Sequence, residues 1–271
     1  MKKKDQKKYV EERWKNMQQH FYLFCHEQDP TALHQMRVMI KKIHSLVKLY
    51  TFTFPEKNEL KLIFKPVRKI FKNAGIIRES QLHLLNLEKT GIRNEQLEIR
   101  LNEIIRIETE KFLKRQKKYG KILDCQLAEF QKEISPITKK QFRLFVNANL
   151  KYAFTNLQRK KHIAQLHESR KSLKSILHLS ELFIPETYGN KKLNIEYLTQ
   201  FAEKIGNWHD LYKTNSWLEE NMNGTIFKEP LLIAIKESMD LIDDAKSNFK
   251  EQVFKTSSSI EADQNNPPIP L

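Results

Sequence analysis

The spacing of apolar residues is the feature that most constrains the fold of this chain. Long segments, among them 93–118 and 226–255, carry apolar side chains at intervals of three and four residues and lack the alternation typical of strands. Only six glycines occur among 271 residues, so few positions favour a break in a helix. The pattern predicts an all-α protein with almost no strand.

Prolines and glycines divide this pattern into helices, because both residue types are common at helix ends and turns. The interruptions are Pro55, Gly75, Gly91, Gly120, Pro185, Gly189, Gly206 and Gly224. A first series of helices is predicted at residues 5–27, 31–54, 56–72, 76–89 and 93–118. A second series is predicted at 139–160, 161–183, 191–204, 207–221 and 226–255. A connecting helix is expected within residues 120–138, ending before Pro136.

A short motif occurs twice in the chain. LHQMRVMIKK at residues 33–42 returns as LHESRKSLKS at residues 166–175, and in each series a glycine follows the motif histidine by 57 positions (91 − 34 and 224 − 167). These regularities predict an internal duplication, with two pseudo-symmetric antiparallel helical bundles related by an approximate twofold axis. We expect bundles at residues 1–119 and 120–256, followed by a disordered tail at 257–271, which has no apolar periodicity.

Basic residues form a stripe opposite the apolar face of each motif helix. At about 100° per residue the first stripe is about 60° wide, and it consists of His34, Arg37, Lys41 and Lys48. The second consists of His167, Arg170 and Lys174, with Lys171 and His178 beside them. Like charges at these spacings repel, which is more understandable if an anion lies across them. Because the stripes avoid the apolar faces, replacing Arg37, Lys41, Arg170 and Lys174 by Glu is expected to leave melting nearly unchanged.

A glycine followed by a charged pair also occurs twice, in NAGIIRES at 73–80 and KIGNWHDL at 204–211. An acidic residue in a first helical turn is explained by the helix dipole alone, and this structural interpretation outweighs the functional one. In the functional interpretation, Arg78 and His209 add donors near a helix N-terminus, where anions bind well.

The charge balance favours a polyanionic partner. Lys and Arg exceed Asp and Glu by 15, which suits nucleic acid, an acidic membrane or a phosphate polymer, although a solvated lysine-rich surface explains it equally well. Two cysteines suit a reducing compartment, and we expect a cytoplasmic protein. The basic start lacks the apolar region of a signal peptide, and no apolar run is long enough to span a membrane.

The repeated motifs resemble those of a known family. DPTALHQMRVMIKK resembles the entry motif of CHAD domains, the conserved-histidine α-helical domains, and LHESRKSLK resembles its second copy. AGIIRES and IGNWHDL are similar to the family's glycine-containing turns before an Arg-Asp or His-Asp pair. The resemblance spans residues 15–255. It implies two helical bundles and a basic central surface that binds inorganic polyphosphate.

This resemblance also implies which residues bind the anion. They are His34, Arg37, Lys41, Lys42, His167, Arg170 and Lys174, with Arg78 and His209 as further candidates, and the stripes add Lys48 and Lys171. The sequence departs from the family pattern at Glu79, where Asp is commoner, and at Ser175 and His178, where basic residues are frequent. Because Ser175 and His178 lie in the second copy, we expect that copy to bind more weakly. Because unperturbed imidazole titrates near about 6.5, binding is expected to strengthen as pH falls through that value.

We interpret the sequence as that of a non-enzymatic protein that binds inorganic polyphosphate and needs no cofactor or metal, and we expect it to associate with polyphosphate granules. The alternative is an RNA-binding protein that uses the same surface, with Trp208 as the only nearby aromatic that could stack on bases. A third class, an enzyme acting on phosphoanhydrides, lacks the acidic clusters that usually hold its metals. Isolated histidines are expected at the surface or in helix caps: His20, His26, His83 and His162. No membrane partner is expected, and the oligomeric state stays open.

Overall fold

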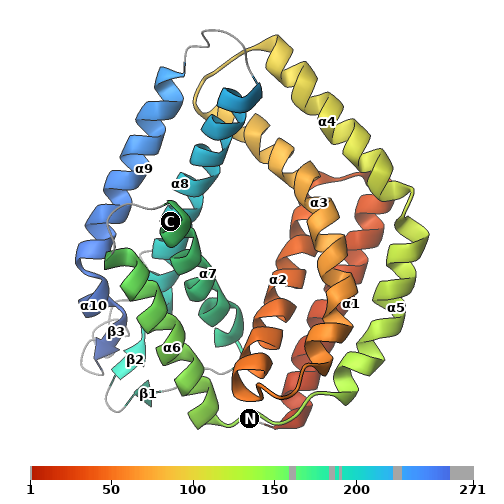
Figure 1. Ribbon diagram of the computed structural model, residues 1–271, viewed down its shortest axis with the longest axis vertical. Coiled ribbons are helices and arrows are strands. Elements are labelled where there is room, and N and C mark those ends of the chain that lie inside the picture. The colour runs from red at the N-terminus through yellow and green to blue at the C-terminus, as the bar shows by residue number, and fades with distance from the viewer. Residues whose placement is uncertain (1, 159–162, 183–186, 189–190, 222–227, 257–271) are drawn as a thin grey trace, which may run out of the picture.

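The computed structural model describes residues 2–158, 163–182, 187–188, 191–221 and 228–256 (Figure 1). Five helices precede residue 133: α1 (Lys3–Glu27), α2 (Pro30–Thr53), α3 (Glu59–Lys89), α4 (Glu95–Leu113) and α5 (Gln116–Lys132). Five follow: α6 (Lys139–Gln158), α7 (Ile163–Ser180), α8 (Ile195–Asn221), α9 (Glu229–Ser247) and α10 (Phe249–Gln252). The all-α prediction is confirmed.

A small antiparallel sheet accompanies the helices. Its strands are β1 (Thr187–Tyr188), β2 (Lys191–Leu193) and β3 (Phe254–Thr256), in the order β1-β2-β3. Helices were predicted at residues 191–204 and 226–255. The prediction was wrong at the start of the first segment, where β2 lies, and at the end of the second, where β3 begins. Asn194 explains the start of α8, because its side chain accepts a hydrogen bond from the Tyr197 backbone N–H while its own N–H donates to Val253.

Gly75 and Gly206 do not end helices, contrary to the prediction. Each lies inside one continuous helix, α3 or α8, where an arginine from another helix crosses it. A Cβ at Gly75 would lie 3.3 Å from Nη1 of Arg37, and one at Gly206 would lie 2.9 Å from Nε of Arg170. The glycines therefore permit close approach. Gly91, with φ of 70°, does follow the end of α3 as predicted.

Part of the sequence-based prediction falls on residues that the structure leaves undescribed. Pro185, Gly189, Gly224, His162 and the tail at 257–271 lie outside the described residues.

The apolar face of α2 packs into the core and thereby orients its basic face. Asp29 caps the helix by accepting hydrogen bonds from two backbone N–H groups, and Pro30 occupies its first turn. Met36, Ile40 and Ile43 are almost fully buried. One core cluster includes buried residues from α1 to α10, so the two halves of the chain share a continuous core.

Helix α5 packs against α1 and α3. The indole N–H of Trp14 on α1 donates to the Leu123 carbonyl on α5 at 2.7 Å, and both residues are buried. The sequence-based division at residue 120 placed most of α5 with the second half. In the structure, by contrast, α5 packs against α1 and α3, which belong to the first half.

The two halves meet where α2 crosses α7. Residues of the repeated motif are 133 positions apart (167 − 34), and the same offset relates Ser45 to His178. Ser45 Oγ lies 3.0 Å from His178 Nδ1, so corresponding positions touch each other. Two contacts flank this pair: Lys42 Nζ to Glu181 at 2.9 Å, and Lys48 Nζ to Ser175 Oγ at 3.2 Å. The same offset relates Lys42 to Ser175 and Lys48 to Glu181.

A second meeting point lies where α3 approaches α8, at the opposite end of the molecule in Figure 1 from the crossing of α2 and α7. The two glycines are 131 positions apart (206 − 75), an offset that relates His83 to Thr214. His83 Nδ1 lies 3.0 Å from Thr214 Oγ1, and the His83 ring stacks on Trp217 with ring centroids 5.4 Å apart. His83 is 3% exposed, so its expected place at the surface or in a cap was wrong.

Candidate functional site

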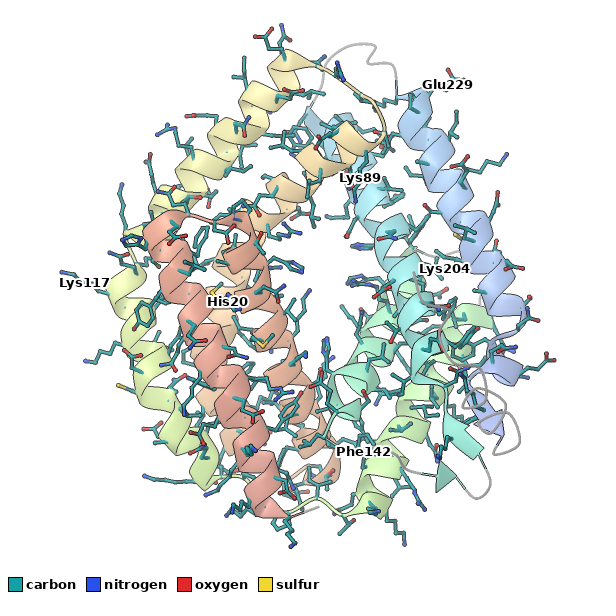
Figure 2. All side chains as sticks on the ribbon, turned by 180° about the vertical axis from the view of Figure 1, so that it is seen from behind. His20, Lys89, Lys117, Phe142, Lys204 and Glu229 are labelled. Atoms are coloured by element: carbon teal, nitrogen blue, oxygen red, sulfur yellow. The ribbon has the colours of Figure 1, made fainter. Side chains whose placement is uncertain are left out.

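The predicted site residues lie on the four central helices, α2, α3, α7 and α8. These helices lie nearest the middle of the molecule, with α2 and α3 from one half facing α7 and α8 from the other (Figure 1). Figure 2 shows side chains from both halves pointing toward the space between them. The two meeting points hold these faces opposite one another.

Arg37 and Arg170 are fixed in the same manner in the two halves. Arg37 Nη1 donates to the Phe71 carbonyl at 2.5 Å, and Arg170 Nε donates to the Ala202 carbonyl at 3.2 Å. Each acceptor lies one helical turn before the glycine that the arginine crosses. The Arg37 guanidinium also lies 4.0 Å from the centre of the Phe71 ring. These arginines therefore link helices as well as carry charge, and these contacts argue against the expectation that replacing them leaves melting unchanged.

Lys41 is the residue on which cations from both halves act. Its side chain is exposed, yet enough protein surrounds it to lower its pKa to about 8. The largest cause is the partial loss of water around the ammonium group, and the positive charges of Arg37, Arg170 and Lys174 add to it. The pKa of Lys174 is lowered too, first by burial and then by Arg170. Motif residues separated by 133 positions thus share one electrostatic environment.

The motif histidines are neutral at neutral pH. Burial, followed by neighbouring cations, lowers the pKa of His34 to about 4. For His167, burial and then His209, whose ring stacks on it at 4.3 Å, lower the pKa to about 4. The assumption of unperturbed imidazoles titrating near 6.5 was therefore wrong for the free protein. His167 Nδ1 is buried and has no hydrogen-bond partner among the described residues.

Arg78 and Asp210 lie at the part of the site formed by α3 and α8. Burial lowers the pKa of Arg78, and the charge of Asp210 opposes that shift. Asp210 also opposes the lowering of the pKa of His34 and of Lys41, so this carboxylate lies among the cations. Arg78 Nε is buried without a hydrogen-bond partner in the described part of the chain. It is therefore a buried donor whose hydrogen bond is not made within the described residues.

The remaining predicted lysines lie toward the crossing of α2 and α7, and each has a partner. Lys42 pairs with Glu181, and Lys171 Nζ lies 2.6 Å from the carboxylate of Glu168. Lys48 donates to Ser175, and its pKa is lowered by burial and by the charge of Lys171. An anion at this end of the site would compete with carboxylates for Lys42 and Lys171.

Sequence reasoning assigned no role to the contacts that join the halves. Ser45, Thr214 and Glu181 carried no motif signal, because their function depends on a partner far away in the sequence. The 133-residue offset could have indicated Ser45 and His178 as a corresponding pair. It could not have indicated that the pair is in contact.

The aromatic residue proposed for RNA stacking is buried. Trp208 is 5% exposed and stacks on Tyr212, with ring centroids 5.7 Å apart. It offers no open face to a base. The RNA-binding alternative therefore loses the one aromatic on which it relied.

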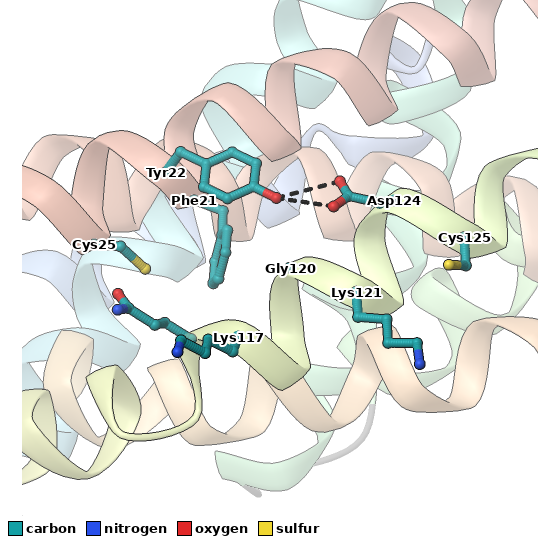
Figure 3. A pocket seen from close by; sticks show the side chains of 9 residues that line it. Phe21, Tyr22, Cys25, Lys117, Gly120, Lys121, Asp124 and Cys125 are labelled. Carbon is teal, nitrogen blue, oxygen red and sulfur yellow. Dashed lines mark hydrogen bonds between the residues drawn. The ribbon is translucent and has the colours of Figure 1, made fainter.

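A pocket of about 560 Å³ lies between α1 and α5, away from the predicted site residues (Figure 3). The Tyr22 hydroxyl donates to the Asp124 carboxylate at 3.1 Å, and Lys117 and Lys121 line the same pocket. Burial raises the pKa of the Cys25 thiol to about 11. Among the described residues, no group of three or more His, Cys, Asp or Glu side chains is placed to hold a metal ion.

A comparison with family models decides the classification. Residues 8–219 match the model described as the CHAD domain. The chain belongs to the CHAD domain family. This match includes both copies of the motif and both meeting points of the halves, and it confirms the resemblance drawn from the sequence.

A solved CHAD domain has the same fold. The crystal structure of the CHAD domain from the plant Ricinus communis is 15% identical, with a TM-score of 0.66, and the match covers 94% of this chain and 93% of that one. No curated protein matched the sequence of this CHAD domain. In the described part of the chain, no helix is long and apolar enough to cross a membrane.

Proposed function

We propose that this CHAD domain binds inorganic polyphosphate on the facing sides of α2, α3, α7 and α8, and that it does so without catalysis. One observation carries the proposal: Arg37 and Arg170 are held by backbone carbonyls on corresponding helices of the two halves, and their charges add to burial in lowering the pKa of Lys41. Holding these cations together is unfavourable in the free protein. A polymer with a negative charge on each phosphate would relieve that repulsion.

The side chains suit a linear phosphate chain. Arg37 and Arg170 are fixed by backbone carbonyls, so their remaining N–H groups are preorganised donors for phosphate oxygens. Lys41 and Lys174 carry mobile point charges that can follow successive phosphates. His34 and His167 are neutral in the free protein and can each donate one hydrogen bond.

Reciprocal contacts support the internal duplication that this proposal includes. Ser45 touches its counterpart His178, and His83 touches its counterpart Thr214. A twofold axis through both meeting points would place the two motif copies on opposite sides of one site. A long polymer would then contact both copies, and the second contact would be intramolecular.

The arginines are poor targets for testing this function, because they link helices. Lys41 and Lys174 are better, because among the described residues neither ammonium group links helices through a hydrogen bond or ion pair, and Lys41 Nζ lies only within 5.9 Å of the centre of the Phe71 ring. The test variant is Lys41→Glu with Lys174→Glu. Lys117→Glu with Lys121→Glu on α5 makes the same change of charge at exposed positions away from the central helices.

Calorimetric titration with long-chain polyphosphate distinguishes the possibilities. The Lys41/Lys174 variant should lose most of its affinity, while the Lys117/Lys121 control should bind nearly as the parent does. Equal losses in both would show that only net charge matters and would refute the proposed site. Single-stranded RNA of equal charge serves as the competing ligand, and tighter binding of RNA than of polyphosphate would favour the alternative.

A further inference from the structure

A second basic pocket lies beside the facing surfaces of the central helices and includes Lys48 of the first basic stripe. It has a volume of about 400 Å³ and is formed by α2, α3 and α6. Three cations line it: Lys48, Lys61 and Arg68. Lys61 and Arg68 belong to neither repeated motif, and their positions on α3 precede Gly75 by two turns or more. The pocket volume falls within the range of about 300–1,000 Å³ that is usual for small-molecule sites.

The charge of this pocket is one-sided. Among the described residues that line it, none is a carboxylate. The carboxylate of Glu168 acts on Lys48, but it pairs with Lys171. By contrast, the pocket between α1 and α5 holds Asp124 beside its lysines. An anion entering between α2, α3 and α6 therefore meets cations without a competing carboxylate in the wall.

Aromatic side chains form much of the remaining wall, beside Val47 and Thr51. Phe52 is 46% exposed and packs edge-on against Phe145, with ring centroids 5.5 Å apart. His44 lies parallel to Phe64 at 5.9 Å, and burial together with Lys48 and Arg68 lowers the pKa of His44 to about 4. The imidazole is thus neutral at pH 7 and offers one donor and one acceptor. A strongly hydrated inorganic anion would leave these apolar surfaces without a partner.

We infer that this pocket binds a nucleoside phosphate, with the base against Phe52 and the phosphates near Lys48, Lys61 and Arg68. An aromatic base stacks on an exposed phenylalanine, and the imidazole of His44 can hydrogen-bond to a base edge. The pocket lining thus offers both cations for the phosphates and rings for the base. This inference does not depend on polyphosphate binding by the central helices.

The test compares ATP with inorganic tripolyphosphate, which carries a similar phosphate chain without a base. Both are titrated calorimetrically into the parent protein at one ionic strength without divalent metal. ATP should bind more tightly. Phe52→Ala should weaken ATP by about fivefold or more, as expected from the loss of a stacked base, while leaving tripolyphosphate unchanged. Phe52→Tyr keeps the ring and should bind ATP as the parent does.

Two further variants locate the ligand. Arg68→Glu should weaken both ligands at this pocket, whereas Lys41→Glu with Lys174→Glu should leave the Phe52-dependent part of ATP binding intact. If Phe52→Ala leaves ATP affinity unchanged, the inference is refuted. If only the Lys41/Lys174 variant loses ATP, the ligand lies between the central helices. The pocket inference would then fail while the proposed function stood.

Discussion

Ser45 and His178 occupy corresponding positions in the two motif helices, and they contact each other, with Ser45 Oγ 3.0 Å from His178 Nδ1. This contact joins α2 to α7 at one end of the basic site. His178 is surrounded by Lys174, Lys41, Lys42 and Lys48, whose charges add to burial and lower its pKa to about 3. The interface between the halves therefore requires a neutral imidazole.

Acid should weaken the fold through this interface. Unfolded histidine titrates near about 6.5, whereas the pKa is about 3 for His178 and about 4 for His83 in the folded protein. Below pH 6.5 the unfolded state binds these protons first, so the free energy of unfolding falls as pH drops toward the folded values. Between pH 6.5 and 5.5 each histidine should cost on the order of 1 kcal/mol.

Urea unfolding at pH 7.0 and pH 5.5 measures this loss. His178→Gln removes the titrating group, so its stability should fall less between the two pH values than that of the parent. An equal fall in both proteins would mean that His178 titrates normally. His20→Gln on α1 is the matched control.

Alanine at the two crossed glycines should have unequal effects. At Gly206 the new Cβ would lie 2.9 Å from Arg170 Nε, and the arginine would have to give up its bond to Ala202. This overpacking should lower the free energy of unfolding by about 1–3 kcal/mol. At Gly75 the contact is 3.3 Å, and the helix propensity of Ala offsets it by about 1 kcal/mol. Thermal melting should rank Gly206→Ala well below Gly75→Ala, and the reverse order would contradict the packing described.

Polyphosphate binding should weaken as pH rises through about 8. Protonated Lys41 favours the anion, and burial with neighbouring cations lowers its pKa to about 8, so its charge is lost in this range. Affinity measured from pH 7 to pH 9 should therefore decline in the parent protein. Lys41→Arg keeps its charge throughout and should flatten the profile. A parent profile that is already flat would remove Lys41 from the site.

Salt should weaken polyphosphate binding steeply. Neutralising a dense phosphate chain with lysine and arginine releases condensed counterions, so the logarithm of the affinity should fall linearly with that of the salt concentration. Titrations between 50 and 200 mM salt, roughly the range over which such contacts lose most affinity, give the slope. The Lys41→Glu, Lys174→Glu variant should show a shallower slope than the parent, and equal slopes would mean that these lysines contact no phosphate.

Much of the fold is local in origin, which is why the sequence predicts it. The period of apolar residues in α2 places Met36, Ile40 and Ile43 inward and Lys41 outward, whatever the neighbouring helices are. The capping residue Asp29 and Pro30 define the start of this helix. The same local rules failed at Gly75 and Gly206, because a glycine that ends a helix and one that admits a crossing side chain look alike in sequence.

Placement of the basic residues was predictable, but their chemistry was not. From the sequence alone, periodicity determined the helices, the two basic stripes and the recurrence of the motif. Only the tertiary structure decided that Arg37 and Arg170 bind backbone carbonyls and that His34 and His167 are neutral. It also decided that Ser45 meets His178. Hydrogen-bond partners and pKa values depend on groups brought together from distant parts of the chain, and a helical period carries no information about those distances.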